Sequence, residues 1–120
     1  IVQLLNHSFF GVSGILYSFL GGDKGMIQVS VRKNSIEMYG HAGHMDLSGV
    51  DRVCSAVSAL TCTLINALTD LSGDRIRADT GSGMTVIEWE DLTDGGKLLV
   101  DAWFLGLVDI DREYNCIEFR

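Results

Sequence analysis

The chain has 120 residues and 47% hydrophobic residues, which is enough for one globular domain that folds without disulfides. Its three cysteines are an odd number with no close pair, which argues against a disulfide framework and favours a reducing, cytoplasmic compartment. They form no CxxC pair, so the sequence does not support a zinc ribbon or a thioredoxin-type site. The formal net charge of −7 argues against nucleic acid as the ligand and favours a basic partner, although such a charge also serves solubility alone.

The first 25 residues differ from the rest of the chain. Residues 1–22 contain no Asp, Glu, Lys or Arg. They lack the basic start of a secretory signal, and polar residues interrupt their apolar patches, so we expect neither a signal peptide nor a membrane span. Residues 21–25 read Gly-Gly-Asp-Lys-Gly, as an in-frame, purine-rich ribosome-binding site would encode. We therefore interpret residues 1–25 as a non-native or upstream extension, with Met26 as the natural start and residues 26–120 as the domain.

Alternating apolar residues indicate a β-hairpin at the start of this domain. The alternation covers residues 27–31 and resumes over residues 36–40, on either side of Arg-Lys-Asn-Ser. The second strand leads directly into Gly40, His41, Ala42 and Gly43. Residues 44–50 contain Gly, Ser and Asp and indicate a loop, which we expect to gate the substrate.

The most apolar stretch of the chain follows, and it predicts a helix. Apolar residues recur at helical spacing from Val53 to Leu71, and no charged residue lies between Arg52 and Asp70. We therefore expect this helix to be buried on most sides. Asp51 suits its N-terminal end and Gly73 its C-terminal end.

The remaining pattern predicts a second strand pair, a second helix and a last strand. The strands cover residues 75–79 and 84–90, joined by Thr-Gly-Ser-Gly, and the last strand covers residues 116–120. The helix covers residues 94–114, with an apolar stripe at Leu98, Ala102, Leu105 and Val108. The order β-β-α-β-β-α-β predicts a single α+β domain with its helices packed on one sheet.

Two side chains near the first helix are candidates for chemistry. Cys54 falls in the first helical turn, where the helix dipole is expected to lower the thiol pKa. His41 falls at the end of a strand, which a short loop can bring to the start of the helix. A Cys–His pair in contact provides a nucleophile and a proton donor, and free N–H groups at the helix start could stabilise an oxyanion. Gly40 and Gly43 would allow close approach of the backbone.

The motifs around these two residues resemble one protease family. Gly40-His41-Ala42-Gly43 followed by Asp51-Arg52-Val53-Cys54-Ser55-Ala56-Val57-Ser58 resembles the ribosomal-processing cysteine protease family, Prp, over residues 26–120. The resemblance implies that His41 and Cys54 are a catalytic dyad. It also implies a homodimeric cysteine endopeptidase that needs no cofactor. The implied substrate is a large-subunit ribosomal protein, or a phage capsid or scaffold protein, from which a short N-terminal extension is removed after an aromatic or apolar pair.

Other interpretations of Cys54 remain open at this point. A cysteine in an apolar helix is usually a small buried hydrophobe. The main alternative is therefore a non-catalytic α+β binding module that docks a basic ribosomal or phage protein. A thiol redox protein and a hydrolase of small esters or amides are weaker alternatives. If Cys54 is catalytic, we expect it to react with iodoacetamide faster than Cys62 or Cys116, which we interpret as core cysteines.

Several neighbouring residues are candidates for supporting roles. Asp51 could orient the dyad, but capping the helix explains it fully. Ser58 could bond near the thiol, although a bond back to a helix carbonyl is the simpler interpretation. Ser55 is a candidate for lining the pocket. We expect no metal site at His41, His44 and Asp46, because zinc needs four ligands of matched geometry. For Trp103, Phe104 and Leu107, both a core position and a dimer face are consistent with the pattern.

Overall fold

The computed structural model describes residues 25–43, 47 and 51–120. The predicted extension up to residue 24, His44, Asp46 and most of the predicted gating loop lie outside the described residues. The elements are β1 (Ile27–Val31), β2 (Ser35–Gly40), α2 (Arg52–Asp70), β3 (Ile76–Gly81), β4 (Met84–Trp89), α3 (Asp94–Tyr114) and β5 (Ile117–Phe119). This order confirms the predicted β-β-α-β-β-α-β arrangement.

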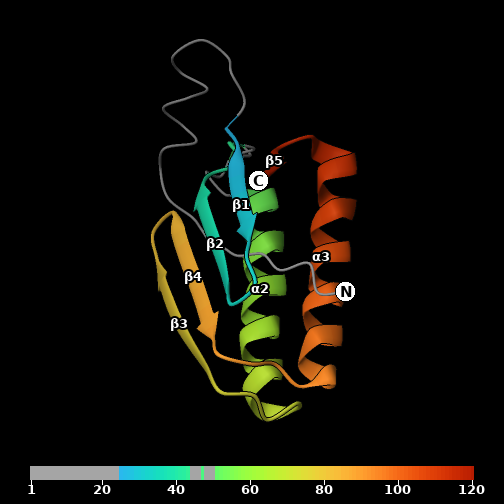
Figure 1. Cartoon of the computed structure of the whole chain (residues 1–120). Coiled ribbons are helices and arrows are strands. Elements are labelled where there is room, and N and C mark those ends of the chain that lie inside the picture. Colours follow the sequence, from blue (N-terminus) through green and yellow to red (C-terminus); the bar gives the residue numbers. More distant parts are fainter. Residues whose placement is uncertain (1–24, 44–46, 48–50) are drawn as a thin grey trace.

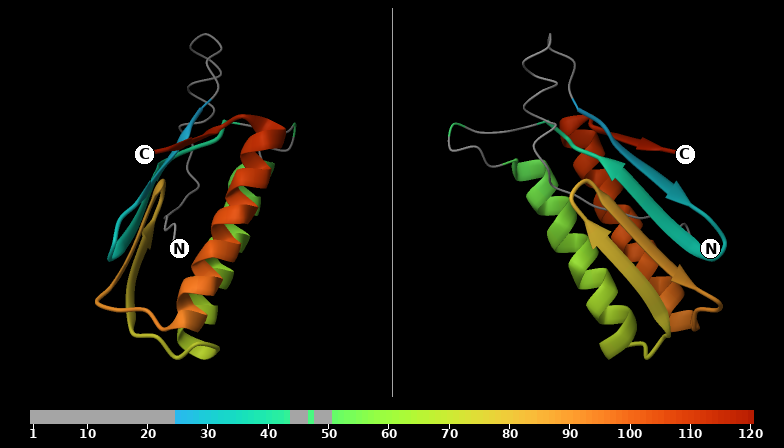
Figure 2. Two further views of the ribbon diagram at one scale, coloured as in Figure 1. Left: turned by 45° about the vertical axis from the view of Figure 1, so that its right-hand side comes forward. Right: turned by 90° about the vertical axis from the view of Figure 1, so that its left-hand side faces the viewer.

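The strands form one sheet with the order β3-β4-β2-β1-β5. Neighbouring strands are antiparallel except β5, which pairs in parallel with β1. Both helices lie side by side on one face of this sheet (Figure 1, Figure 2). The fold is therefore the α+β layer of helices on a sheet that the sequence predicts.

The core lies between the sheet and the helices. Apolar residues of β1, β2 and β4 are fully buried against one stripe of each helix, and they are joined in a single cluster that includes Val29, Ile36, Met38, Ile87, Val53, Val57, Leu64, Leu68, Val100, Trp103 and Leu107. Thr61 is one of the buried polar residues of the domain, and its hydroxyl is paired within the core. The Thr61 hydroxyl donates to the carbonyl of Val57 at 2.7 Å and accepts from Nε1 of Trp103 at 3.1 Å. This bond ties α2 to α3 and leaves the indole N–H satisfied.

Two predictions about helix faces are wrong. The helix α2 is not buried on most sides, because its outer face of small uncharged residues is exposed, at Ser55, Ala56, Ala59, Cys62, Thr63, Asn66 and Thr69. Cys62 is therefore exposed, whereas Cys116 is buried as expected. In α3 the predicted stripe faces outward, with Leu98 70% and Leu105 64% exposed. The helix α3 is apolar on two sides, and the side that carries Trp103 packs on the sheet because it buries the larger apolar area.

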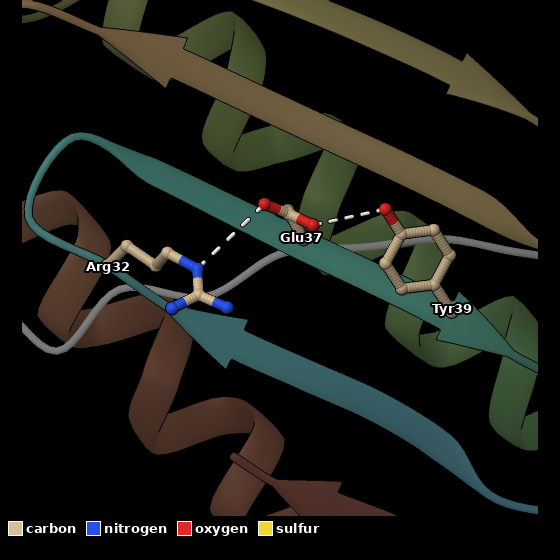
Figure 3. Close-up of polar contacts among 3 residues, drawn as sticks. All are labelled: Arg32, Glu37 and Tyr39. Carbon is tan, nitrogen blue, oxygen red and sulfur yellow. Dashed lines mark hydrogen bonds and ion pairs between the residues drawn. The ribbon is translucent and has the colours of Figure 1, made fainter.

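The face of the sheet away from the helices is polar (Figure 3). Arg32 Nε lies 3.9 Å from Glu37 Oε2, and the Tyr39 hydroxyl donates to Glu37 Oε1 at 3.1 Å. Partial burial, together with the hydrogen bond and charge of Glu37, raises the pKa of Tyr39. A polar outer face of this kind is typical of an antiparallel sheet with one solvated side.

A buried carboxylate joins the two helices at the end where α2 finishes and α3 begins. Asp74 accepts hydrogen bonds from the Ser72 hydroxyl at 2.5 Å, the Thr93 N–H at 2.8 Å and the Thr93 hydroxyl at 2.9 Å. Thr93 in turn caps α3 by accepting from the N–H of Gly96. Burial raises the Asp74 pKa, but these hydrogen bonds outweigh it and lower the pKa overall.

Candidate active site

The candidate nucleophile lies where the end of β2 meets the start of α2. Cys54 is in the first turn of α2 and only 3% exposed. Its Sγ accepts a hydrogen bond from the backbone N–H of Ala42 at 3.4 Å. Ala42 directly follows His41, so this contact confirms that the strand end and the helix start meet. Figure 1 shows that the turn between β3 and β4 lies at this same end of the sheet.

His41 is half-buried, and its ring is held by packing. Its Nδ1 is buried and has no hydrogen-bond partner in the part of the chain that the structure describes. The Nε2–Cε1 edge of the ring lies against Gly83, where an added Cβ would be 2.9 Å from Nε2 and 3.0 Å from Cε1. Burial lowers the His41 pKa, while the Asp51 carboxylate acts in the opposite direction. The imidazole is therefore neutral at neutral pH and can accept a proton.

Asp51 caps α2, as its position predicts. Its Oδ1 accepts from the N–H groups of Val53 and Cys54, each at 3.0 Å, and its backbone carbonyl accepts from the N–H of Ser55 at 3.0 Å. These three N–H groups are consequently occupied. The N–H groups of Val53 and Cys54 are therefore not free to stabilise an oxyanion in this structure.

The expected lowering of the thiol pKa is also wrong. Burial raises the pKa of Cys54 to about 12, the Ala42 N–H opposes this shift, and the negative charge of Asp51 adds to it. The physical reason is that the capping carboxylate offsets the positive end of the helix, while the thiol is removed from water. Cys116 also contributes to the raised pKa, although it is far from Cys54 in sequence. In the resting site the Cys54 thiol and the His41 imidazole are therefore both neutral.

The two glycines singled out beside His41 both need their lack of a side chain. Gly40 has φ +101° and Gly43 has φ +73°, which are left-handed conformations that favour glycine. A Cβ on Gly40 would also meet the carbonyl of Met26. The sharp turn that follows β2, and hence the position of His41, depends on these conformations.

The two candidate serines have different environments. The exposed Ser55 hydroxyl donates to the carbonyl of Asp51 at 3.0 Å and so supports the cap. The Ser58 hydroxyl is buried and makes no hydrogen bond to the described residues, so the expected bond back to a helix carbonyl is wrong. Among residues 25–43, 47 and 51–120, no group of three or more His, Cys, Asp or Glu side chains could hold a metal ion.

Sequence reasoning missed two contributors to this site. The backbone N–H of Ala42 donates a hydrogen bond to the Cys54 sulfur. Almost any residue type has such an N–H group, so the identity of residue 42 does not predict this contact. Gly83 contacts His41 from another part of the chain. The Thr-Gly-Ser-Gly signal indicated a turn at Gly83, but the pairing of β4 with β2, which brings this turn to His41, is a long-range feature.

Comparison with known proteins agrees with this arrangement. The family model described as cysteine protease Prp matches residues 26–117. The chain belongs to the cysteine protease Prp family. The ribosomal processing cysteine protease Prp of Bacillus subtilis (strain 168) is 30% identical over 103 residues, which cover 75% of this chain and 91% of that protein.

Two crystal structures of similar proteins share the fold. One is an essential ribosomal processing protease Prp from S. aureus in complex with a covalently linked product peptide. It superposes with a TM-score of 0.69 and 26% identity, covering 80% of this chain and 97% of that one. A protein from Streptococcus mutans has a TM-score of 0.59 and 28% identity, covering 82% and 93%. The chain is thus a peptide hydrolase of the ribosomal processing cysteine protease family, and its α+β fold is that of Prp.

Proposed function

We propose that the chain is an endopeptidase that removes a short N-terminal extension from a large-subunit ribosomal protein, with Cys54 as nucleophile and His41 as general base and acid. The observation that carries the proposal is the hydrogen bond from Ala42 to the Cys54 sulfur, because it brings the residue next to His41 against the thiol. The B. subtilis and S. aureus relatives are ribosomal processing proteases. The S. aureus relative was crystallised with a covalently linked product peptide, which is consistent with covalent catalysis.

The proposed reaction is acyl transfer through a thioester. His41 accepts the thiol proton as the Cys54 sulfur attacks the scissile carbonyl carbon. The C–N bond then breaks as His41 gives that proton to the leaving amine. Water attacks the thioester, His41 takes its proton, and the released sulfur takes the proton back.

The protonation state of the free site suits a reaction that begins only after the substrate binds. Both partners start neutral, so charge separates at the moment of attack rather than in the empty site. The Ala42 N–H faces the sulfur and stabilises negative charge as it develops there. Asp51 supports this geometry by fixing the first turn of α2. Gly40 and Gly43 support it by shaping the backbone around His41. Ser55 is a candidate for lining the peptide pocket, and Ser58 is a candidate for a hydrogen bond near the thiol.

The substrate class, compartment and assembly follow the same proposal. The net charge of −7 suits a basic ribosomal protein in the cytoplasm. An extension on a phage capsid or scaffold protein would present the same kind of peptide.

We also propose a homodimer, which the exposed Leu98 and Leu105 on α3 support. Sedimentation of the wild type and of a Leu98→Ser/Leu105→Ser variant tests this: a wild-type dimer that dissociates in the variant is expected, and a wild-type monomer would contradict it.

A mass-spectrometric cleavage assay tests the function. Two peptides are used, one with a ribosomal protein extension and its first mature residues, and one with a phage capsid extension. The wild type and a control Cys62→Ser variant, changed at an exposed thiol, should cut one bond of the ribosomal peptide, and Cys54→Ala and His41→Ala should not. Cutting of only the phage peptide would reassign the substrate. Unchanged cutting by Cys54→Ala would overturn the proposed nucleophile.

A further inference from the structure

The turn between β3 and β4 is fixed against the end of β2. Gly83 has φ +74°, which turns the chain into β4. Its carbonyl accepts a hydrogen bond from the N–H of Gly40 at 3.0 Å. Gly40 directly precedes His41, so this backbone hydrogen bond holds the turn beside the histidine.

The contact between this turn and the His41 ring leaves no room for a side chain. A Cβ on Gly83 would lie 2.9 Å from Nε2 and 3.0 Å from Cε1 of His41. Carbon atoms that are not bonded to these atoms normally approach no closer than about 3.5 Å. The backbone of His41 has little freedom to move the ring away, because hydrogen bonds hold both of its neighbours. The N–H of Gly40 donates to the Gly83 carbonyl, and the N–H of Ala42 donates to the Cys54 sulfur.

Packing against Gly83 takes a role that a hydrogen bond often has in such sites. In a Ser–His–Asp triad, a third residue bonds to the imidazole and sets its orientation. The Nδ1 of His41 has no partner of that kind among the described residues. The contact with Gly83 restrains the ring at its Nε2–Cε1 edge.

We propose that Gly83 is a positioning residue for His41, in which the absence of a side chain allows the imidazole to take its position next to Ala42, whose N–H contacts the Cys54 thiol. The inference rests on the proposed function, because His41 must be the base for its position to matter. A methyl group at residue 83 displaces the ring. A displacement of about 1 Å in a reacting group can cost roughly 100-fold in rate, so kcat should fall at least about tenfold.

Two other glycines give matched controls. Gly73 has φ +69°, close to that of Gly83, but a Cβ there meets nothing within 4 Å. Gly73→Ala therefore reproduces the backbone strain without the contact. Gly81 lies at the start of the same turn, and a Cβ added there would also meet no atom within 4 Å. Gly81→Ala therefore controls for any change to the turn.

The experiment measures kcat and KM across pH for the three alanine variants and the wild type, using the peptide that the wild type cuts. Gly83→Ala should lower kcat with KM changed less than about twofold. The acid limb of kcat/KM should move to higher pH, because a displaced ring loses part of the burial that lowers its pKa, while Asp51 remains the charged group acting on it. Gly73→Ala and Gly81→Ala should keep the wild-type profile. A wild-type kcat and pH profile in Gly83→Ala would overturn the proposal.

A second measurement separates this inference from the proposed function. In the wild type, NMR should show a nuclear Overhauser contact between the Gly83 α-protons and the His41 Hε1, and its absence would overturn the proposal even if the protein is active. If the wild type cuts no peptide, the proposed function fails, and the contact and the His41 titration in Gly83→Ala still decide the geometry. If Gly83→Ala does not fold although Gly73→Ala does, the nuclear Overhauser contact in the wild type decides the inference, and its absence overturns it.

Discussion

The Cys54 thiol is expected to be slow toward small alkylating agents in the free protein. At pH 8, a free cysteine of pKa about 8.5 is roughly one quarter thiolate. With a pKa of about 12, Cys54 is thiolate in only roughly one molecule in 10⁴. The greater nucleophilicity of a more basic thiolate recovers about 25- to 60-fold of this difference. The net reactivity is then roughly 40- to 100-fold below that of free cysteine, and the burial of the sulfur lowers it further.

This expectation reverses the one drawn from the sequence. Because Cys62 is exposed on the outer face of α2, it should be the first cysteine that iodoacetamide modifies at pH 8. The assay is a time course of alkylation in the free protein, read by mass mapping of the peptides that contain Cys54, Cys62 and Cys116. The Cys62→Ser variant serves as control, and it should show slow alkylation at Cys54 rather than none.

The result that would refute this reasoning is faster labelling at Cys54 than at Cys62 at pH 8. It would mean that the thiolate is already formed in the empty site. The helix dipole would then outweigh burial and the Asp51 carboxylate, contrary to the geometry of the cap.

Three further predictions concern stability. Asp51→Ala should lower the free energy of unfolding by about 0.5–2 kcal/mol, because the cap of α2 is lost. Asp51→Asn should keep most of the cap and, because it removes the negative charge, should speed Cys54 alkylation. Equal urea midpoints for the two variants would contradict the capping role. Thr61→Val leaves the Trp103 N–H without its acceptor and should cost about 1–3 kcal/mol, whereas Thr61→Ser should cost less; equal losses in urea would contradict the bond. The pKa of Asp74 is depressed on folding, so its contribution is present above the unfolded pKa and lost as pH falls through the folded one. The wild type should therefore lose more stability than Asp74→Asn between pH 7 and pH 3, and parallel losses would count against this.

Much of the fold follows from local patterns in the sequence. The second helix was expected over residues 94–114, and α3 covers Asp94–Tyr114. Strand alternation likewise located both hairpins to within two residues. Which side of α3 faces the sheet could not be predicted, because Leu98 and Leu105 form an apolar stripe as clear as that of Trp103 and Leu107. Only the packing of the large indole against the sheet decides between the two stripes.

The site was predicted less completely than the fold. The motif spacing placed His41 and Cys54 at the junction of β2 and α2, and the structure has that junction. The charge state of the thiol was predicted wrongly, because burial and the Asp51 cap depend on how the helix start is covered. The roles of Ala42 and Gly83 depend on contacts between distant segments, which no local pattern reports.

The central claim is that Cys54 attacks the peptide and carries it as a thioester. The most direct measurement mixes the protein with the ribosomal extension peptide, stops the reaction in acid within milliseconds to seconds, and records the intact mass. The account predicts an added mass equal to the N-terminal product, located on the Cys54 peptide, released by hydroxylamine and absent in Cys54→Ala. Peptide cleavage in the wild type without any such adduct, and with equal cleavage in Cys54→Ala, would contradict the account.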